Sequence, residues 1–313
     1  MKILIIDKVH FSLKNELTKL GFTCDEDFDS NYSQIKDMIG KYDGLIIRSR
    51  INVDINFLNS CKNLKFIARY GAGLENIDLI EAKKRKIQII SSGEGNKQAV
   101  AEHCIGMILT LFNKINTANI QIKNKIWDRK SNIGIEISGK TFGILGYGNT
   151  GSALAKCLSG FDCKILVYDK FKSNFSNEYI IECNLDEIYK QADIISLHIP
   201  YNSSNHYYFN DIFLDNMNKP FYIINSSRGK VVNMNTINKG IISKKILGAC
   251  LDVLEFEDNS FYEKNTSKFK YMDKLFERNN IIFTPHIAGI TYESYKKLSH
   301  ILIKKIKTIV AKI

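Results

Sequence analysis

Short apolar runs alternate with amphipathic stretches along the first third of the chain. Runs at residues 3–6, 45–47, 64–68 and 87–90 predict buried strands, and helical spacing of apolar residues predicts helices near 11–20, 32–39, 55–60 and 80–84. Strands that alternate with helices predict a parallel sheet covered on both faces. Ligands bind such sheets at the carboxyl ends of the strands. Two of these ends read Arg48-Ser49-Arg50 and Arg69-Tyr70-Gly71-Ala72-Gly73.

A longer helical pattern follows, from Asn96 to about Ile122. Its apolar residues cover more than half of the helix circumference, so this helix is predicted to bury more than one face. Such a helix is expected at a domain junction or at a subunit interface.

The second half of the chain repeats the alternation and predicts a second parallel sheet. Its apolar runs lie at residues 141–145, 164–168, 194–198, 222–225, 249–253 and 281–283. The last stretch, 292–310, has the pattern of a long amphipathic helix. A basic helix of this kind can bind a partner, but packing against the first domain is the favoured interpretation.

A glycine-rich turn lies between the first two predicted strands of the second sheet and reads Gly146-Tyr147-Gly148-Asn149-Thr150-Gly151. Here the first glycine permits a tight turn, the second lets a pyrophosphate approach the backbone, and the third lets a helix pack against its strand. The N–H groups at the helix start face the phosphates. Asp169 follows the next strand, where a carboxylate can accept hydrogen bonds from the adenosine ribose. The pattern predicts dinucleotide binding, with NAD favoured because Asp169 would repel the 2′-phosphate of NADP.

Length and composition narrow the class of protein. A chain of 313 residues favours two domains. Apolar residues make up 44% of it, but no apolar run approaches the roughly 20 residues that span a bilayer, so no membrane contact is expected. The start of the chain, residues 1–6, is predicted to be a strand and not a signal peptide. The seven scattered cysteines lack any Cys-x-x-Cys pair and predict a reduced, cytoplasmic protein without a metal site.

The formal net charge of +11 at pH 7 raises the question of nucleic acid. The lysines, however, are spread over the whole chain, and the densest cluster is only Lys304, Lys305 and Lys307. A lysine-rich solvated surface is therefore expected, with no nucleic-acid partner. Its positive field could still attract a small anionic substrate.

Three polar residues follow strand ends of the second predicted sheet: Arg228, Glu257 and His286. Each also has an ordinary interpretation, as a solvated loop charge for Arg228 and Glu257 and as a structural histidine for His286. Their spacing alone leaves both interpretations open.

Several motifs in order along the chain resemble the D-2-hydroxyacid dehydrogenase family, and within it the phosphoglycerate dehydrogenases. The matching segments span nearly the whole chain and read RYGAGLENID, GNKQAVAEH, GYGNTG, LHIP, NSSRG, LDV and TPHIAG. An ordered set of motifs is far more specific than one glycine fingerprint.

The resemblance implies roles for the three polar residues. His286 would be the acid/base, Glu257 would orient it, and Arg228 would hold the substrate carboxylate and carbonyl oxygen. The chemistry agrees, because a hydride leaves a carbinol carbon only if a base takes the hydroxyl proton, and imidazole titrates near working pH. A neighbouring carboxylate fixes the tautomer, and a planar guanidinium matches the two oxygens of a carboxylate.

The resemblance also implies binding residues. The cofactor would meet the glycine turn, Asp169, His198, Pro200 and Asp252, the last of which receives the nicotinamide amide. The full cofactor set is Gly146, Gly148, Asn149, Thr150, Gly151, Asp169, His198, Pro200, Ser226, Asp252 and Gly289. The substrate set is Arg48, Ser49, Arg69, Gly71, Ala72, Gly73 and Arg129, with the N–H groups around residues 71–73 as a second carboxylate site.

By the same resemblance the fold class is α/β, with two doubly wound parallel-sheet, Rossmann-like domains and a cleft between them. Residues 1–97 with 288–313 would form a flavodoxin-like substrate-binding domain. Residues 98–287 would form the NAD-binding domain. The long helix at its start would lie in the interface of a homodimer. The chain after Ile287 is expected to be too short for a regulatory domain.

Three segments depart from the pattern of the family. Asp258 follows Glu257 where a proline is usual, so the choice of Glu257 over Glu255 rests on its offset from Asp252. The segment from Asn259 to Asn280 is longer than usual and has no derived role. The loop that begins at Tyr201 also differs from the leucine-threonine loop of the family.

Three functions remain open at this stage. The first is NAD-dependent oxidation of 3-phosphoglycerate to 3-phosphohydroxypyruvate, because Arg48, Arg50, Arg69 and Arg129 could supply cations for a phosphate. The second is the same chemistry on an unphosphorylated acid such as lactate, glycerate or hydroxypyruvate. The third is a non-catalytic NAD-sensing protein, because this fold also serves transcriptional corepressors. The complete set of Arg228, Glu257 and His286 argues against the third.

Overall fold

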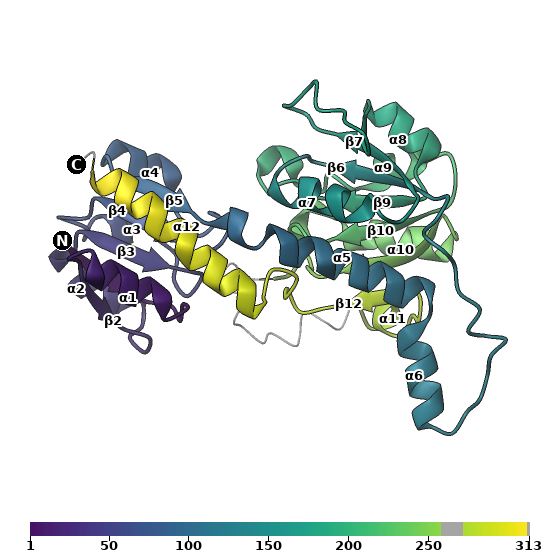
Figure 1. Ribbon diagram of the computed structural model, residues 1–313, viewed down its shortest axis with the longest axis horizontal. Helices are drawn as coiled ribbons and strands as arrows, with labels where there is room; N and C mark the ends of the chain where they lie inside the picture. The colour runs from purple at the N-terminus through teal and green to yellow at the C-terminus, as the bar shows by residue number, and fades with distance from the viewer. Residues whose placement is uncertain (258–271, 312–313) are drawn as a thin grey trace. The chain divides into compact units, whose positions relative to one another are not determined.

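The computed structural model describes residues 1–257 and 272–311 and divides them into two compact units. One unit comprises Met1–Asn96 with the described part of Ile290–Ile313. The other comprises Lys97–Glu257 with the described residues of the stretch that ends at Gly289. Each unit is built on its own parallel sheet (Figure 1).

The first unit has a five-stranded parallel sheet in the order β2-β1-β3-β4-β5. This is the order of flavodoxin-like folds. Its strands are β1 (Lys2–Ile5), β2 (Thr23–Glu26), β3 (Gly44–Ile47), β4 (Phe66–Arg69) and β5 (Gln88–Ser91). The apolar runs predicted four of them. The edge strand β2 was not predicted, because its sequence Thr-Cys-Asp-Glu has no apolar run.

Helices cover both faces of this sheet. On one face lie α1 (Ser12–Lys19) and α12 (Tyr292–Val310), whose apolar side chains share a core with β1. α2 (Tyr32–Met38), α3 (Ile55–Leu58) and α4 (Leu79–Lys84) lie on the other face, with the 3₁₀ turn η1 (Ile39–Lys41). The final helix thus packs against the N-terminal part of the chain, next to α1, β5 and the turn η2 (Gly93–Gly95).

The second unit has a seven-stranded parallel sheet in the order β12-β11-β10-β9-β6-β7-β8. Its strands are β6 (Thr141–Leu145), β7 (Lys164–Tyr168), β8 (Ile181–Glu182), β9 (Ile194–Leu197), β10 (Phe221–Asn225), β11 (Ile246–Leu251) and β12 (Ile281–Phe283). The strand order reverses between β6 and β9, and in such sheets ligands bind at the carboxyl side of that switch point. The short β8 was not predicted.

Two helices, α5 (Lys97–Phe112) and α7 (Asn149–Leu158), share one core on one face of the larger sheet. The opposite core contains side chains of the helices α8 (Leu185–Gln191), α9 (Asp211–Asn216), α10 (Met234–Ile242) and α11 (Asp273–Phe276). Two 3₁₀ turns, η3 (Ser203–Asn205) and η4 (Gly229–Val231), follow β9 and β10.

The predicted helix from Asn96 to Ile122 is broken in the structure. Lys114 has φ +52, a left-handed conformation, and a separate helix α6 (Ile115–Lys123) starts after it. The returning chain donates the N–H of Ile135 to the last carbonyl of α5, at Phe112 (3.1 Å). α6 buries no side chain and stands away from the sheet (Figure 1).

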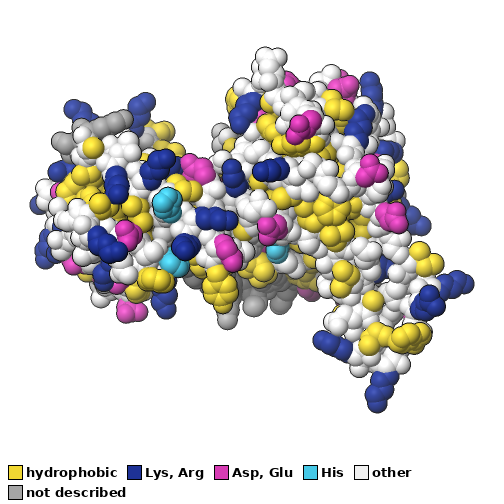
Figure 2. All heavy atoms as spheres, viewed as in Figure 1, with side chains coloured by type: hydrophobic (Ala, Val, Ile, Leu, Met, Phe, Trp, Pro, Cys, Tyr) yellow, Lys and Arg dark blue, Asp and Glu magenta, His cyan; other side chains and the backbone are white. Residues whose placement is uncertain are grey.

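The predicted fold class, α/β with two doubly wound parallel sheets, is confirmed. Lys and Arg side chains are dispersed over the face in Figure 2, with Asp and Glu between them. Among the described residues, no helix is both long and apolar enough to cross a membrane. The unexplained segment Asn259–Asn280 lies largely outside the described residues, which resume at Met272 with α11.

Candidate active site

The glycine turn after β6 is closed by contacts that exclude side chains. Gly146 has φ +98, which favours glycine, and a Cβ there would lie 2.6 Å from the carbonyl oxygen of His198. A Cβ at Gly151 would overlap the carbonyl oxygen of Gly146. At Gly148 a Cβ would meet only open space. The turn is therefore tight at its two ends and accessible at its middle glycine.

The start of α7 faces the open side of this turn. Its N-cap is Gly148, so no side chain caps the first N–H groups of the helix. An uncapped N-terminus next to an accessible glycine offers both donors and space for an anion. The local geometry fits the pyrophosphate of a dinucleotide.

Asp169 directly follows β7, and its carboxylate accepts hydrogen bonds from the glycine turn and from the backbone after Asp169. Its Oδ2 accepts the Tyr147 N–H at 2.7 Å, and its Oδ1 accepts the N–H groups of Phe171 and Lys172 at 2.9 and 3.1 Å. The Lys172 ammonium donates to the Tyr147 carbonyl oxygen at 2.6 Å. These contacts fix the carboxylate beside the glycine turn, and the Lys172 ammonium is bonded to the backbone of that turn.

We expect Asp169→Ala to weaken the preference for NAD over NADP. In the unchanged protein the carboxylate would repel a 2′-phosphate and accept ribose hydroxyls, each bond to a charged group contributing roughly 1.5 to 3 kcal/mol. Catalytic efficiency with each cofactor measures the preference. Equal efficiency with both cofactors in the unchanged protein would refute this role.

His198 is buried between the end of β9 and α7. Its Nε2 lies 2.8 Å from Ser196 Oγ, and its Nδ1 lies 3.1 Å from Thr150 Oγ1. Burial lowers the pKa of His198 to about 4, so the ring is neutral at pH 7. The ring therefore joins the predicted cofactor residue Thr150 to Ser196 of the sheet. Pro200, two residues on, is exposed and accepts the Asn205 side-chain amide at 2.8 Å.

The lowered pKa of His198 predicts a pH dependence of stability. The unfolded chain takes up a proton near the usual pKa of about 6.5, whereas the folded chain does so only near 4. The stabilisation is thus complete above pH 6.5 and falls by about 1.4 kcal/mol per pH unit as the pH drops toward 4. Denaturant unfolding from pH 4 to 7 should show this slope, reduced in His198→Asn. An identical slope in both proteins would contradict it.

Asp252 organises the loop after β12. It is only 1% exposed, and its Oδ1 accepts the Thr284 hydroxyl at 2.6 Å and the Ile287 N–H at 2.8 Å. Its Oδ2 accepts the Ala288 N–H at 2.9 Å, and its carbonyl oxygen accepts the His286 N–H at 2.7 Å. His286 has φ +55, a left-handed conformation that a non-glycine residue seldom adopts. One buried carboxylate therefore holds a loop in which His286 takes an unusual backbone geometry.

Glu257 meets the imidazole of His286. Its Oε2 lies 2.7 Å from His286 Nδ1, and its Oε1 accepts the Leu254 N–H at 2.5 Å. About a quarter of each side chain in the pair is exposed. Glu255 instead accepts the N–H of Met234, the first residue of α10, at 3.1 Å. The structure thus places Glu257, and not Glu255, against the histidine.

Arg228 lies on the neighbouring turn, after β10. Its Nη1 donates to the Ser227 carbonyl oxygen at 2.6 Å. A Cβ on the next residue, Gly229, would overlap the carbonyl oxygen of Leu254, so the Arg228 turn packs directly on the loop that leads to Glu257. Ser226, predicted to bind the cofactor, has its hydroxyl 3.1 Å from the Cys104 thiol.

One histidine near this loop was not identified from the sequence. His103, on α5, has its Nε2 3.0 Å from Thr284 Oγ1 and 3.6 Å from Asp252 Oδ1. It is the last residue of the segment GNKQAVAEH, and that position was the only sequence signal available. No local pattern connects residues that lie 181 positions apart.

Arg48 and Arg69, the predicted substrate arginines, lie in the first unit at the carboxyl ends of adjacent strands. The Arg48 Nη1 donates to the Tyr295 hydroxyl of α12 at 3.0 Å. Arg69 is largely buried, and its Nη1 donates to the Tyr70 carbonyl oxygen at 2.6 Å. Arg69 is the neighbour of Ile47 across the two strands, so these two side chains leave the same face of the sheet. Arg48 directly follows Ile47 and therefore starts from the opposite face.

The backbone at Gly71 passes directly over the side chain of Arg69. Gly71 has φ +138, and a Cβ there would overlap the Arg69 guanidinium. The Gly71 N–H donates to Ser92 Oγ at 3.1 Å. Within the part of the chain that the structure describes, the N–H groups of Ala72 and Gly73 meet no acceptor. Ser49, also predicted to bind substrate, is buried.

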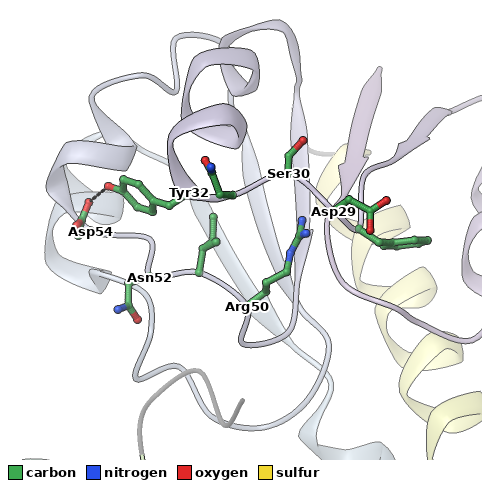
Figure 3. Close-up of a pocket in the computed structure, with 9 residues that line it drawn as sticks. Asp29, Ser30, Tyr32, Arg50, Asn52 and Asp54 are labelled. Carbon is green, nitrogen blue, oxygen red and sulfur yellow. Dashed lines mark hydrogen bonds between the residues drawn. The ribbon is translucent and has the colours of Figure 1, made fainter. Parts of the chain in front are cut away.

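Arg50 lines a separate groove in the first unit, between the loops that follow β2 and β3 (Figure 3). Its Nη2 donates to the Asp27 carbonyl oxygen at 2.6 Å. Across the groove the Tyr32 hydroxyl donates to Asp54 at 2.7 Å. Among the described residues, the lining of this groove includes Arg50 but neither Arg48 nor Arg69.

Arg129, the remaining predicted substrate residue, is exposed on the segment that follows α6 in the second unit. Trp127, close to it, is 81% exposed. Within the described residues, no three His, Cys, Asp or Glu side chains are grouped so that they could hold a metal ion.

The chain is similar in sequence to proteins of one known family. The family model of the D-isomer specific 2-hydroxyacid dehydrogenase NAD binding domain matches residues 105–288. A hydroxypyruvate reductase of Thermotoga maritima is 32% identical over 275 residues, which cover 87% of this chain and 86% of that protein. A D-3-phosphoglycerate dehydrogenase of Archaeoglobus fulgidus is 29% identical over 308 residues, 98% of this chain but only 56% of that protein.

The chain also resembles a solved structure over its whole length. The D-lactate dehydrogenase of Aquifex aeolicus, complexed with NAD and lactic acid, superposes with a TM-score of 0.85 at 26% identity. The match covers 100% of this chain and 96% of that one.

Proposed function

Because the chain belongs to the D-isomer-specific 2-hydroxyacid dehydrogenase family, we propose that it interconverts a small 2-hydroxy acid and its 2-oxo acid, with His286 as the acid/base. Family membership makes the chain an NAD-dependent oxidoreductase. The single observation that supports the role of His286 is its 2.7 Å contact with Glu257 in the NAD-binding unit.

The proposed proton transfer uses the far nitrogen of the His286 ring. Glu257 faces Nδ1, so it fixes the tautomer and leaves Nε2 to exchange a proton with the substrate oxygen. A neighbouring carboxylate also stabilises the imidazolium that forms when the ring takes the hydroxyl proton. Arg228 would bind the carboxylate and the carbonyl oxygen of the substrate through its guanidinium.

The glycine turn, the uncapped start of α7 and Asp169 would hold the dinucleotide. When bound, NAD supplies the acceptor and the donor of the hydride. Asp252 would accept the nicotinamide amide as well as its present donors, because a carboxylate has about four acceptor positions. The remaining predicted cofactor residues, from Asn149 to Gly289 along the chain, lie in the same unit.

We propose 3-phosphoglycerate as the substrate, oxidised to 3-phosphohydroxypyruvate. Its two anionic groups need cations besides Arg228, and Arg48 and Arg69 stand at carboxyl ends of strands where ligands of parallel sheets bind. Charge-assisted bonds to phosphate are stronger than ordinary surface ion pairs. A resemblance to the A. fulgidus phosphoglycerate dehydrogenase along nearly the whole chain supports this choice.

One observation favours a second candidate, an unphosphorylated acid such as hydroxypyruvate. Arg69 is largely buried and donates to Tyr70, and Arg48 donates to Tyr295, so both arginines already have partners. The similar T. maritima protein is a hydroxypyruvate reductase. A site that serves a small acid would not need these arginines for a phosphate.

A substrate panel, followed by NADH absorbance, separates the two candidates. For 3-phosphoglycerate, Arg69→Gln should lower catalytic efficiency steeply while slow activity on lactate or glycerate stays nearly unchanged. Arg85→Gln is a control, because Arg85 pairs with Glu81 on the surface at 2.8 Å. Equal efficiency on both kinds of acid, or equal losses on both, would favour the unphosphorylated substrate.

We also propose a homodimer that covers the apolar surface of α6 and the segment after it. Each of the apolar side chains concerned is at least half exposed: Ile115, Ile120, Ile122, Ile126, Trp127 and Ile133. All six lie within one short stretch of the chain, and grouped exposed apolar side chains are a common feature of protein–protein interaction sites. Arg129 lies on this segment and could reach the phosphate in the site of the other subunit. Trp127→Lys should sediment as a monomer if this surface is the interface.

A further inference from the structure

A chain of hydrogen bonds leads from His103 to the loop that carries His286. His103 lies on α5, and 22% of its side chain is exposed. Its Nε2 is 3.0 Å from Thr284 Oγ1, and the Thr284 hydroxyl is 2.6 Å from Asp252 Oδ1. Neither His103 nor Thr284 has a part in the proposed chemistry.

The number of available protons determines which group donates and which accepts in each of these hydrogen bonds. A threonine hydroxyl carries one proton and can accept others. The short 2.6 Å contact assigns that proton to Asp252, because the alternative acceptor, the Met107 sulfur at 3.7 Å, is weak. The Thr284 oxygen must then accept from His103, so the Nε2 of His103 carries a proton.

The same series of hydrogen bonds restrains the loop that carries His286. Asp252 receives the N–H groups of Ile287 and Ala288 on its two carboxylate oxygens. If the carboxylate rotated, both backbone bonds would weaken, and they hold the two residues that directly follow His286, which has φ +55. The orientation of the carboxylate therefore affects the position of the His286 ring relative to Glu257.

We propose that His103 is a positioning residue that acts through Thr284 and Asp252 on His286. The Nε2–H of His103 orients the Thr284 hydroxyl, and the hydroxyl orients the Asp252 carboxylate toward the loop 284–288. The kinetic part of this inference rests on the proposed function of His286. The structural part does not, because it concerns the loop in the protein without substrate.

Hydrogen exchange tests the structural part. In His103→Leu the donor is lost, so the peptide that spans Thr284 to Gly289 should exchange roughly tenfold faster than in the unchanged protein. His103→Gln keeps an N–H donor and should restore most of the protection. His300→Leu is the matched control, because His300 is exposed on α12 in the other unit. Exchange in the control should stay unchanged.

A double-mutant cycle tests the kinetic part. His103→Leu and Thr284→Val break the same chain, so each should lower kcat, and the double variant should be no slower than the slower single variant. The dissociation constant of NADH, measured by fluorescence, should change less than kcat. His103→Gln should recover most of the lost turnover.

Several results would overturn the inference: unchanged exchange in both His103→Leu and Thr284→Val, losses of kcat that multiply in the double variant, or no rescue by His103→Gln. Failure of the proposed function has a different signature. In that case the unchanged protein turns over no 2-hydroxy acid. Hydrogen exchange of the peptide Thr284 to Gly289 is still faster in His103→Leu and still largely protected in His103→Gln.

Discussion

His286→Asn is expected to lower kcat by roughly 10²- to 10⁴-fold, the usual contribution of a positioned acid/base. Asparagine removes the titrating ring but tolerates the left-handed backbone that this position requires, at φ +55. The loss should therefore reflect chemistry and not a rearranged loop. Steady-state rates at saturating substrate measure it.

NADH binding is the control for His286→Asn. The glycine turn and Asp169 lie at the ends of β6 and β7, on other strands than the one that precedes His286. The dissociation constant of NADH should thus change little. A variant that keeps a tenth or more of the normal kcat would exclude His286 as the acid/base.

Arg228→Lys is expected to lower catalytic efficiency about a hundredfold or more. Lysine keeps the charge but loses the planar pair of donors that matches a carboxylate. Each hydrogen bond to a charged group contributes roughly 1.5 to 3 kcal/mol, and about 1.4 kcal/mol corresponds to a factor of ten. Most of the effect should fall on KM for the acid, with a further loss in kcat if Arg228 also holds the carbonyl oxygen.

The matched control for Arg228→Lys is Lys230→Gln. Lys230 lies two residues further along in the same turn, and its side chain is exposed. Its removal tests whether any cation near the turn attracts the substrate. Similar losses in the two variants would indicate a general field effect and not a specific carboxylate contact.

Elements with a strong local pattern were predictable from the sequence. β6, β7, β12 and α12 have the predicted bounds, because apolar runs and helical spacing are properties of adjacent residues. The edge strands β2 and β8 were missed because their residues are polar or few, and only pairing with a neighbour makes them strands. The break at Lys114 was missed because an αL residue leaves the apolar spacing on both sides intact.

In the candidate site, too, local relations were predictable from the sequence and long-range ones were not. The offset from Asp252 predicted that Glu257 and not Glu255 would face the histidine, and the structure places Glu257 there. Arg48 and Arg69 stand on adjacent strand ends, as predicted, but begin from opposite faces of the sheet. The face depends on the register of the strands, which no single segment contains. The link from His103 to Asp252 is long-range in the same way.

The pH dependence of 2-oxo acid reduction in Glu257→Gln and Glu255→Gln tests the central claim most directly. Both variants remove one carboxylate charge from the same short loop, but only Glu257 faces His286. Glu257→Gln should lower the rate and move the pH optimum downward, because the protonated ring has lost its carboxylate partner. Glu255→Gln should leave the optimum in place. A shifted optimum in Glu255→Gln with none in Glu257→Gln would contradict the assignment of the pair.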